Sequence, residues 1–267
     1  MYTLNELKDY ANVLGFKTAE QAEKDYLQEL LLKMLYSKIP GERLVFGGGT
    51  ALSKVYSTGR FSSDLDFVSN HVKIRDIERE TGQAIKLLSN FYECKFEKET
   101  FRDMLGYEIK VNGPLYTEKN ESSKQKLSID INLYEKIILP PLAIIRYPVY
   151  PDITPYTLVI KQLEDLFFDK LLALNERKKT AARDLYDIYV VLKKVPVLDA
   201  KKLGALLDAK TKEKNALFFS EIAKKIDLIK PIWKQEISQL TGNIADFETV
   251  KQYTESALSN ILLQITQ

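Results

Sequence analysis

Residues 46–67 read FGGGTALSKVYSTGRFSSDLDF and combine a run of three glycines with two closely spaced aspartates. The aspartates, Asp64 and Asp66, lie in a short alternating segment that predicts a strand over 64–68. Side chains two apart on a strand point to the same face, so the two carboxylates are expected side by side. Like charges held that close repel unless a cation joins them, and paired carboxylates suit Mg²⁺.

The glycine run predicts a turn that binds phosphate. Residues 44–46 predict a short apolar strand, and residues 50–56 predict a helix with Thr50 near its N-cap. Glycines between a strand and a helix let the backbone approach a phosphate closely, and the helix N-terminus adds a partial positive charge. Together the turn and the aspartates predict a site that moves a nucleotidyl group.

The order of these motifs resembles that in the nucleotidyltransferase superfamily. Their residues are similar to those of the AbiEii/AbiGii toxin family of abortive-infection systems. That family has a Gly-Gly-Thr/Ser turn, an Arg-Phe-Ser lead-in and an Asp-x-Asp pair. The matching residues are Gly48, Gly49, Thr50, Arg60, Phe61, Ser62, Asp64 and Asp66. The chain departs from the pattern at Gly47, where many relatives have Lys or Arg. The resemblance implies that the metal ligands and catalytic residues include Asp64 and Asp66. It also implies a nucleotide-binding set of Gly48, Gly49, Thr50, Arg60 and Ser62.

A third carboxylate is expected on the segment 126–134, KLSIDINLY, which predicts a central strand. Ile129 and Ile131 are expected to face a core, which leaves Asp130 on the opposite face. In the nucleotidyltransferase fold a third carboxylate comes from a neighbouring strand. The resemblance therefore implies that Asp130 completes the metal shell and acts as a catalytic base. The alternative is a surface aspartate on an edge strand.

Residues 169–189, DKLLALNERKKTAARDLYDIY, resemble a second signature of the same family. The matching residues are Lys170, Ala173, Leu174, Arg177, Arg183, Asp184, Tyr186 and Asp187. Lys170 and Arg177 lie close to two helical turns apart and are expected on one face. The resemblance implies that Lys170 and Asp187 are catalytic, and that Lys170, Arg177 and Arg183 bind the nucleotide. These cations could also hold an RNA acceptor, and the alternative is a helix pair joined by surface salt bridges.

The composition excludes several classes of protein. The 267 residues carry a net charge of +2, so any basic surface for nucleic acid must be local. A single cysteine, Cys94, excludes an internal disulfide and favours a reducing compartment. The single histidine, His71, is expected in a loop. With one histidine and one cysteine, a zinc site of the usual ligand types is nearly excluded. No apolar stretch reaches transmembrane length and no signal peptide is evident, so we expect a cytoplasmic protein without a membrane partner.

The periodicity predicts an α+β fold, with a nucleotidyltransferase-type mixed sheet flanked by helices and followed by a C-terminal helical bundle. Helices are expected over 18–37 and 73–90, the first of them amphipathic. A hairpin is expected over 92–99 and 105–111, and a mobile polar loop over 113–124. The prolines from 148 to 155 predict an irregular connection, and helices follow from about 159 to the end. We expect residues 1–157 to form the nucleotidyltransferase domain, and residues 158–267 to form a helical domain that contributes Lys170 and Asp187.

The resemblance implies a metal-dependent nucleotidyltransferase that uses Mg²⁺ or Mn²⁺ and acts as a toxin with a cognate antitoxin. It would pass a nucleoside monophosphate from a nucleoside triphosphate to an acceptor hydroxyl. Relatives are linked to GTP binding and to modified tRNA 3′ ends, so GTP or a pyrimidine nucleotide and tRNA are candidate substrates. Three alternatives stay open: a nucleotide-binding regulatory module without transfer, a nucleotidyltransferase that modifies protein, and an Asp-x-Asp glycosyltransferase.

Overall fold

The computed structural model describes residues 2–70, 72–118, 120–195, 198–211, 215–242 and 244–266. The chain forms two compact units, Met1–Ile137 with Pro141–Lys161, and Ile138–Pro140 with Gln162–Gln267. His71, expected in a loop, lies outside the described residues. The division of function between residues 1–157 and 158–267 stays a prediction.

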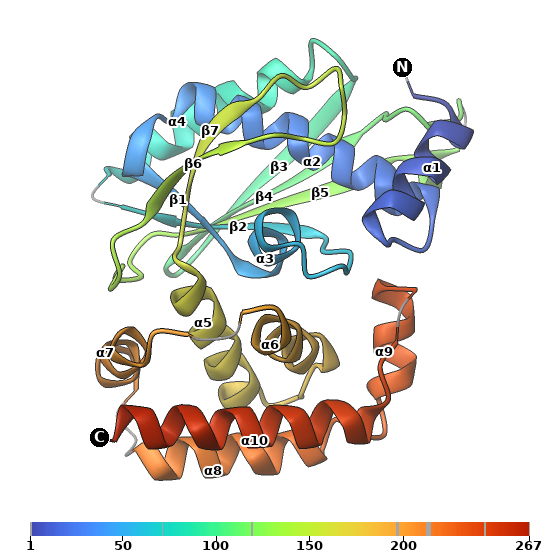
Figure 1. Cartoon of the computed structure of the whole chain (residues 1–267). Helices are drawn as coiled ribbons and strands as arrows, with labels where there is room; N and C mark the ends of the chain where they lie inside the picture. Colours follow the sequence, from blue (N-terminus) through green and yellow to red (C-terminus); the bar gives the residue numbers. More distant parts are fainter. Residues whose placement is uncertain are drawn as a thin grey trace. The chain divides into compact units, whose positions relative to one another are not determined.

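The described residues of the first unit include a seven-stranded mixed sheet with the order β3-β4-β5-β2-β1-β7-β6 (Figure 1). Its strands are β1 Leu44–Gly47, β2 Asp64–Ser69, β3 Cys94–Phe101, β4 Met104–Val111, β5 Gln125–Asn132, β6 Leu142–Arg146 and β7 Tyr156–Ile160. The pairs β2–β5 and β1–β7 are parallel, and the other neighbours are antiparallel. The α+β class, the strand after the glycine turn and the β3–β4 hairpin are therefore confirmed.

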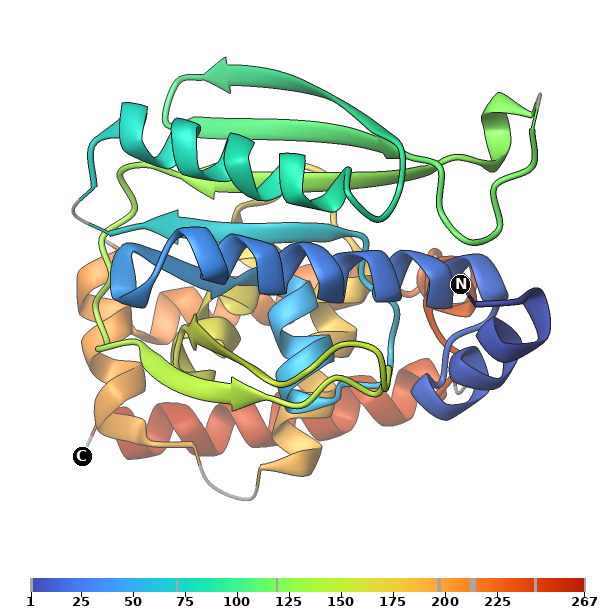
Figure 2. The same cartoon turned by 90° about the horizontal axis from the view of Figure 1, so that it is seen from above.

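Helices cover the two faces of this sheet unequally. The helices of the unit are α1 Leu4–Leu14, α2 Ala19–Lys38, α3 Gly48–Tyr56 and α4 Ile74–Leu88, with short 3₁₀ turns at Gly41–Arg43 and Glu121–Ser123. Figure 2 looks onto the face that carries α2 and α4, whereas α3 packs on the other face against β1 and β2. Tyr107 donates a hydrogen bond to the Glu78 carbonyl of α4, so Tyr107 and its register partner Ile129 face the helices.

Strand β5 alternates as predicted. Leu127, Ile129 and Ile131 are fully buried, while Ser128 and Asp130 are partly exposed on the opposite face. Because β5 lies between β4 and β2, the alternative that Asp130 sits on an edge strand is wrong. Asp130 instead shares a sheet face with Asp66 of β2, and its register neighbour on β4 is Gly106.

Three local features differ from what the sequence predicted. The segment expected as an irregular connection running into a helix at 159 contains β6 and β7, which pair with each other and extend the sheet beside β1. Their β-branched runs are too short to be separated from a buried helix by periodicity alone. Helix α2 is not amphipathic: it is buried almost all round and carries buried Asp25 and Glu29. Helix α1 was not predicted, although Thr3 and Glu6 form a capping box at its start.

The loop expected over 113–124 is tied to α2, with Lys119 outside the described residues. The Leu115 N–H donates a 2.6 Å hydrogen bond to Glu23 Oε1, and a Cβ on Gly113 would lie 2.6 Å from the same oxygen. The loop is therefore anchored at its start, and its predicted mobility stays a prediction.

The regular secondary structure described in the second unit is all α-helical, as predicted. Its helices are α5 Leu163–Glu176, α6 Ala182–Lys194, α7 Ala200–Lys210, α8 Asn215–Asp227, α9 Trp233–Leu240 and α10 Phe247–Ile265. Phe168 of α5 stacks on Phe218 of α8 with ring centroids 5.7 Å apart, in a core that also buries Leu171 and Ile222. Among the described residues of the whole chain, none of the helices combines the length and apolar character that crossing a bilayer requires.

Candidate active site

The glycine turn lies directly against the second aspartate. Strand β1 ends at Gly47, which is in register with Asp66 of β2, and α3 begins at Gly48. Gly48 has a φ of +67°, in the left-handed region that favours glycine. A Cβ on Gly48 would also overlap Asp66 Oδ2. Both the backbone conformation and the lack of space therefore require glycine at position 48.

Thr50 does not cap the helix as expected. The N-cap is Gly47, which makes no side-chain capping bond, so α3 starts two residues earlier than predicted. Thr50 lies in the first turn, is buried, and donates a hydrogen bond from Oγ1 to the Asp64 carbonyl. The first backbone N–H groups of α3 have no intrahelical acceptors, which is the arrangement that binds phosphate at a helix N-terminus.

Arg60 and Ser62 pack behind the next glycine. A Cβ on Gly49 would lie 2.5 Å from Arg60 Nη2 and 3.1 Å from Ser62 Oγ. The Arg60 side chain is buried and its Nη1 donates a 2.9 Å hydrogen bond to the Phe61 carbonyl. The structure therefore brings Arg60 and Ser62 to the turn, where they brace its shape. Their direct contact with nucleotide stays a prediction.

The three predicted carboxylates share one face of two parallel strands. Asp66 is in register with Asp130, and Asp64 is in register with Ser128. All three aspartates are partly buried. Burial raises the pKa of the Asp130 carboxyl, and the negative charge of Asp64 raises it further. The strand pairing thus concentrates negative charge that a cation would stabilise.

These donors fit a divalent cation that is shared with a substrate. Within the described ranges, His, Cys, Asp and Glu side chains form no group of three that could hold a metal ion by themselves. Mg²⁺ is commonly bound by one or two carboxylates, with waters and substrate phosphates completing its shell. The half-buried, mutually repelling carboxylates of Asp64 and Asp130, beside Asp66 and the glycine turn, match that donor set.

Lys161 and Glu135 form a part of this site that the sequence reasoning missed. Lys161 directly follows β7, and its N–H donates a 3.0 Å hydrogen bond to the Phe46 carbonyl. Its side chain is 4% exposed, and Nζ lies 2.5 Å from Glu135 Oε1. A Cβ on Gly47 would lie 3.5 Å from Lys161 Cδ. The ion pair therefore packs behind the turn, and only the parallel pairing of β7 with β1 brings it there.

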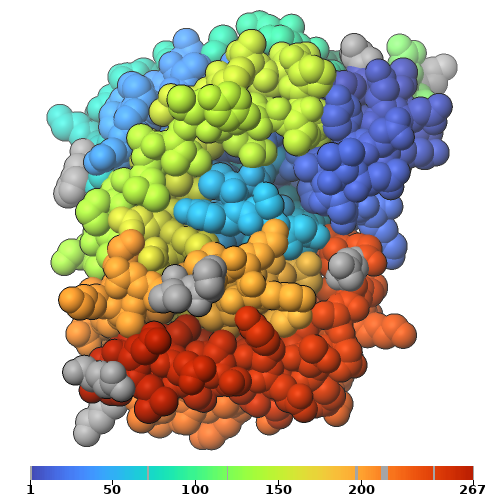
Figure 3. All heavy atoms as spheres, in the orientation of Figure 1, coloured from blue at the N-terminus to red at the C-terminus, as the bar shows by residue number. Residues whose placement is uncertain are grey.

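A buried ionic network holds α3 in place. Lys54 of α3 pairs with Asp25 of α2 and lies 3.5 Å from Glu29 Oε1. Arg146 of β6 lies 2.6 Å from Glu29 Oε1 and donates a 2.6 Å hydrogen bond to the Lys54 carbonyl. On the face seen in Figure 3, the light-blue surface of α3 lies between the dark-blue N-terminal residues and the yellow-green β6–β7 segment.

In the second unit, the predicted signature forms a compact ionic cluster. Lys170 Nζ lies 3.2 Å from Asp184 Oδ1 and 3.1 Å from Asp187 Oδ2. Arg177 Nε lies 3.1 Å from Asp184 Oδ2. Both aspartates are fully buried, so these are not surface salt bridges, whereas Arg183 is exposed. The cluster fixes the orientation of Lys170 through two carboxylates.

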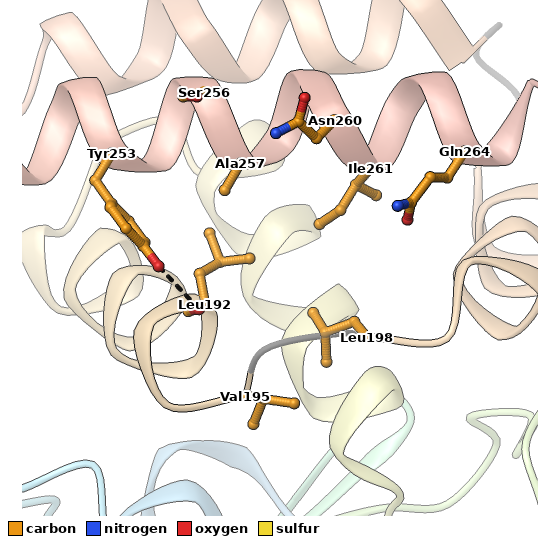
Figure 4. Close-up of a pocket in the computed structure, with 9 residues that line it drawn as sticks. All are labelled: Leu192, Val195, Leu198, Tyr253, Ser256, Ala257, Asn260, Ile261 and Gln264. Atoms are coloured by element: carbon orange, nitrogen blue, oxygen red, sulfur yellow. Dashed lines mark hydrogen bonds between the residues drawn. The ribbon is translucent and has the colours of Figure 1, made fainter.

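A cavity of about 330 Å³ in the second unit lies apart from this cluster (Figure 4). It is lined by the end of α6 and by α10, and Tyr253 beside it donates a 3.2 Å hydrogen bond to the Leu192 carbonyl. It contains none of the predicted site residues, so we do not assign it to the active site.

Comparison with known families agrees with this geometry. The family model described as "Nucleotidyl transferase AbiEii toxin, Type IV TA system" matches residues 30–257. The chain belongs to the AbiEii nucleotidyltransferase toxin family. The match spans the glycine turn, the three aspartates and the Lys170–Asp187 signature. This AbiEii protein is therefore a nucleotidyltransferase enzyme of the type IV toxin–antitoxin class, which excludes the glycosyltransferase alternative.

Solved structures support the AbiEii fold. MenT4, a nucleotidyltransferase toxin from Mycobacterium tuberculosis, is similar with a TM-score of 0.63 and 18% identity, over 98% of this chain and 90% of MenT4. JHP933 from Helicobacter pylori is similar with a TM-score of 0.60 and 18% identity, over 92% of this chain and 94% of JHP933. At this identity the likeness establishes the nucleotidyltransferase fold. No curated protein sequence matched the chain.

Proposed function

We propose that this AbiEii-family enzyme uses Mg²⁺ or Mn²⁺ to transfer a nucleoside monophosphate from a nucleoside triphosphate to the 3′ hydroxyl of an RNA in the cytoplasm. GTP and the pyrimidine nucleotides are the first donors to test, and tRNA is the first acceptor. The observation that carries the proposal is the register of Asp66 with Asp130, beside a Gly48 that lies against Asp66. A cognate antitoxin would restrain the activity, as type IV toxin–antitoxin membership implies.

The geometry of the first unit supports the following roles. The backbone of Gly48, Gly49 and Thr50 would bind the triphosphate at the start of α3. The cation would be held by Asp64, Asp66 and Asp130; when bound, it neutralises charge on the phosphates and lowers the pKa of the acceptor hydroxyl. Arg60 and Ser62 would keep the turn in its binding shape.

Asp130 would accept the proton of the attacking hydroxyl. The hydroxyl oxygen forms a bond to the α-phosphorus, and the bond from that phosphorus to the α,β-bridging oxygen breaks. Pyrophosphate leaves with the electron pair of that bond. Burial raises the pKa of Asp130, and a carboxylate with a raised pKa is a better proton acceptor.

We further propose that residues 1–157 form the nucleotidyltransferase domain and that residues 158–267 contribute Lys170 and Asp187 to its site. Lys170 would bind a phosphate of the nucleotide, with Arg177 and Arg183 as further cations. Asp187, 3.1 Å from Lys170 Nζ, would orient the ammonium group.

The test is to incubate the purified protein with Mg²⁺, total RNA and each α-³²P-labelled nucleoside triphosphate in turn. We expect label on a tRNA-sized band with the wild type and none with Asp64→Asn/Asp66→Asn. The matched control is Asp9→Asn/Glu42→Gln, which removes two carboxylates from exposed positions on α1 and the Gly41–Arg43 turn. Label on protein would replace the RNA acceptor with a protein hydroxyl. No label on either would contradict the proposed transfer.

A further inference from the structure

Strands β3, β4 and β5 present a row of three lysines on the sheet face that carries the aspartates. Lys95 is in register with Lys110, and Lys110 is in register with Lys126. Register partners share a face, and Lys126 lies on the same face of β5 as Asp130 because the two are an even number of residues apart. All three lysines are exposed. We call Lys95, Lys110 and Lys126 the lysine row.

This arrangement favours the binding of a negatively charged ligand. Like charges directly opposite each other on neighbouring strands destabilise a sheet. With neighbouring strands about 4.8 Å apart, the row spans about 10 Å. The Lys126 ammonium lies 3.0 Å from Glu108 Oε1, and its side chain remains 61% exposed. A linear polyanion laid across the three strands would relieve the repulsion along the whole row.

Further lysines extend the positive charge around the row. Burial lowers the pKa of Lys24 on α2. The negative charge of Asp64 raises this pKa, and the positive charge of Lys126 lowers it further. Lys24 is therefore within electrostatic reach of both the catalytic face and the lysine row. The pKa of Glu121 is lowered first by its hydrogen bond to Lys124, and also by the charges of Lys95 and Lys110. The turn at Glu121–Ser123 thus borders the row.

An acidic row separates the lysine row from Asp130. Glu97 and Glu108 are in register, one step closer to the carboxylates. In the next step Gly106 is in register with Asp130, and a Cβ at position 106 would lie 3.5 Å from Asp130 Oδ1. The acidic row repels phosphates, while Gly106 places no side chain between Asp130 and Glu99, its register partner on β3. Charge of alternating sign favours one placement of a polyanion over others.

We propose that the lysine row binds the sugar-phosphate backbone of the RNA acceptor, upstream of the 3′ end that reaches Asp130 over Gly106. This inference rests on the proposed function, since it concerns the acceptor of that same reaction. Lys126 lies four positions before Asp130 along β5, about 13 Å away at 3.3 Å per residue. That distance sets how far the bound phosphates lie from the reacting hydroxyl. The lysine row would therefore favour an RNA whose 3′ end lies about that far beyond the bound backbone.

The test compares two variants that each lose three positive charges. Lys95→Gln/Lys110→Gln/Lys126→Gln removes the row, and Lys73→Gln/Arg75→Gln/Lys86→Gln removes exposed cations at α4, which covers the opposite face. Steady-state transfer to tRNA is measured for both, from about 50 to 200 mM salt. For the row variant we expect KM for RNA to rise about tenfold or more, with kcat and KM for the nucleotide unchanged. The slope of log KM against log[salt] should decrease by about 2. Each phosphate contact on a single strand contributes about 0.7 to that slope, and the variant loses three contacts.

The outcomes separate this inference from the proposed function. Wild-type transfer to RNA with equal KM, kcat and salt dependence in the row and α4 variants would overturn the lysine row as the docking site while leaving the function intact. A row variant whose kcat falls at saturating RNA would also overturn it, because the lysines would then act in the chemical step. Wild type that labels no RNA overturns the proposed function itself.

Discussion

Asp130 on β5 lies directly opposite Asp66 on the neighbouring parallel strand β2, and Asp64 on β2 raises the pKa of Asp130. The two strands are far apart in the chain, and the sheet places their carboxylates on one partly buried face. Repulsion between these groups disfavours the metal-free fold, so a cation that joins them should stabilise it.

We therefore predict that Mg²⁺ or Mn²⁺ raises the thermal midpoint of unfolding even without nucleotide. At a hundredfold excess over Kd the expected gain is about 2.7 kcal/mol, or about 5–10 °C. The Asp64→Asn/Asp130→Asn variant should lose this shift, whereas Asp9→Asn/Glu42→Gln, at exposed positions away from the sheet face, should keep it. Differential scanning calorimetry with and without the cation measures both. Equal shifts in all three proteins would count against a metal site at these aspartates.

Gly48→Ala should impair both the fold and the transfer. The positive φ of Gly48 costs an L-residue about 1–2 kcal/mol, and the new Cβ would overlap the Asp66 carboxylate. Displacing a reacting group by about 1 Å can cost on the order of 10²-fold in rate, so we expect a loss of that size in kcat/KM.

The matched control for Gly48→Ala is Gly82→Ala in α4, where a new Cβ meets nothing within 4 Å. Alanine is the better helix former, so this variant should gain about 0.5–1 kcal/mol and keep full activity. Urea denaturation and transfer kinetics distinguish the two. A Gly48→Ala enzyme with wild-type kinetics would show that the turn does not need glycine.

Lys54→Met should destabilise the protein in a pH-dependent way. Burial alone would raise the pKa of Glu29, but Lys54, Arg146 and the Tyr156 hydrogen bond lower it below its usual value. The stability that Glu29 contributes is therefore present above about pH 4.5 and is lost as the pH falls through its folded pKa.

Removing Lys54 leaves Asp25 and Glu29 buried with one counter-charge fewer. We expect a loss of about 3–5 kcal/mol near pH 7, because an uncompensated buried charge is costly. The loss should shrink toward pH 4 as Glu29 takes up a proton. Urea denaturation at several pH values measures it, with the exposed Lys86→Met as control. A loss that stays constant with pH would mean that packing, not charge, explains the role of Lys54.

Asp184→Asn should weaken the second unit and the transfer together. Asp184 is fully buried between Lys170 and Arg177, so its replacement breaks two ion pairs and should cost about 1–3 kcal/mol. Lys170 would keep Asp187 alone as a partner, and we expect a higher KM for the nucleotide.

The control for Asp184→Asn is Asp208→Asn on the exposed side of α7, which should change stability by less than about 0.5 kcal/mol. Thermal unfolding and nucleotide titration measure both variants. If Asp184→Asn raised neither KM nor the fraction unfolded, the cluster around Lys170 would have no part in nucleotide binding.

The sequence by itself determined the local parts of this protein. The glycine turn, the Asp64–Asp66 pair, the outward side of Asp130 and the Lys170–Asp187 helices follow from spacing and periodicity, which are short-range properties. The same motifs also indicated the family, because few residue types suit a phosphate-binding turn or a cation-binding carboxylate pair.

Only the tertiary structure decided which distant residues meet. The register of Asp66 with Asp130, the Lys161–Glu135 pair behind Gly47, and the alignment of Lys95, Lys110 and Lys126 all depend on strand pairing between separate segments. The burial of α2 and the strands β6 and β7 were misjudged for the same reason. Side-chain pattern shows which face of an element is apolar, but the partner and the register are fixed by packing across the whole sheet.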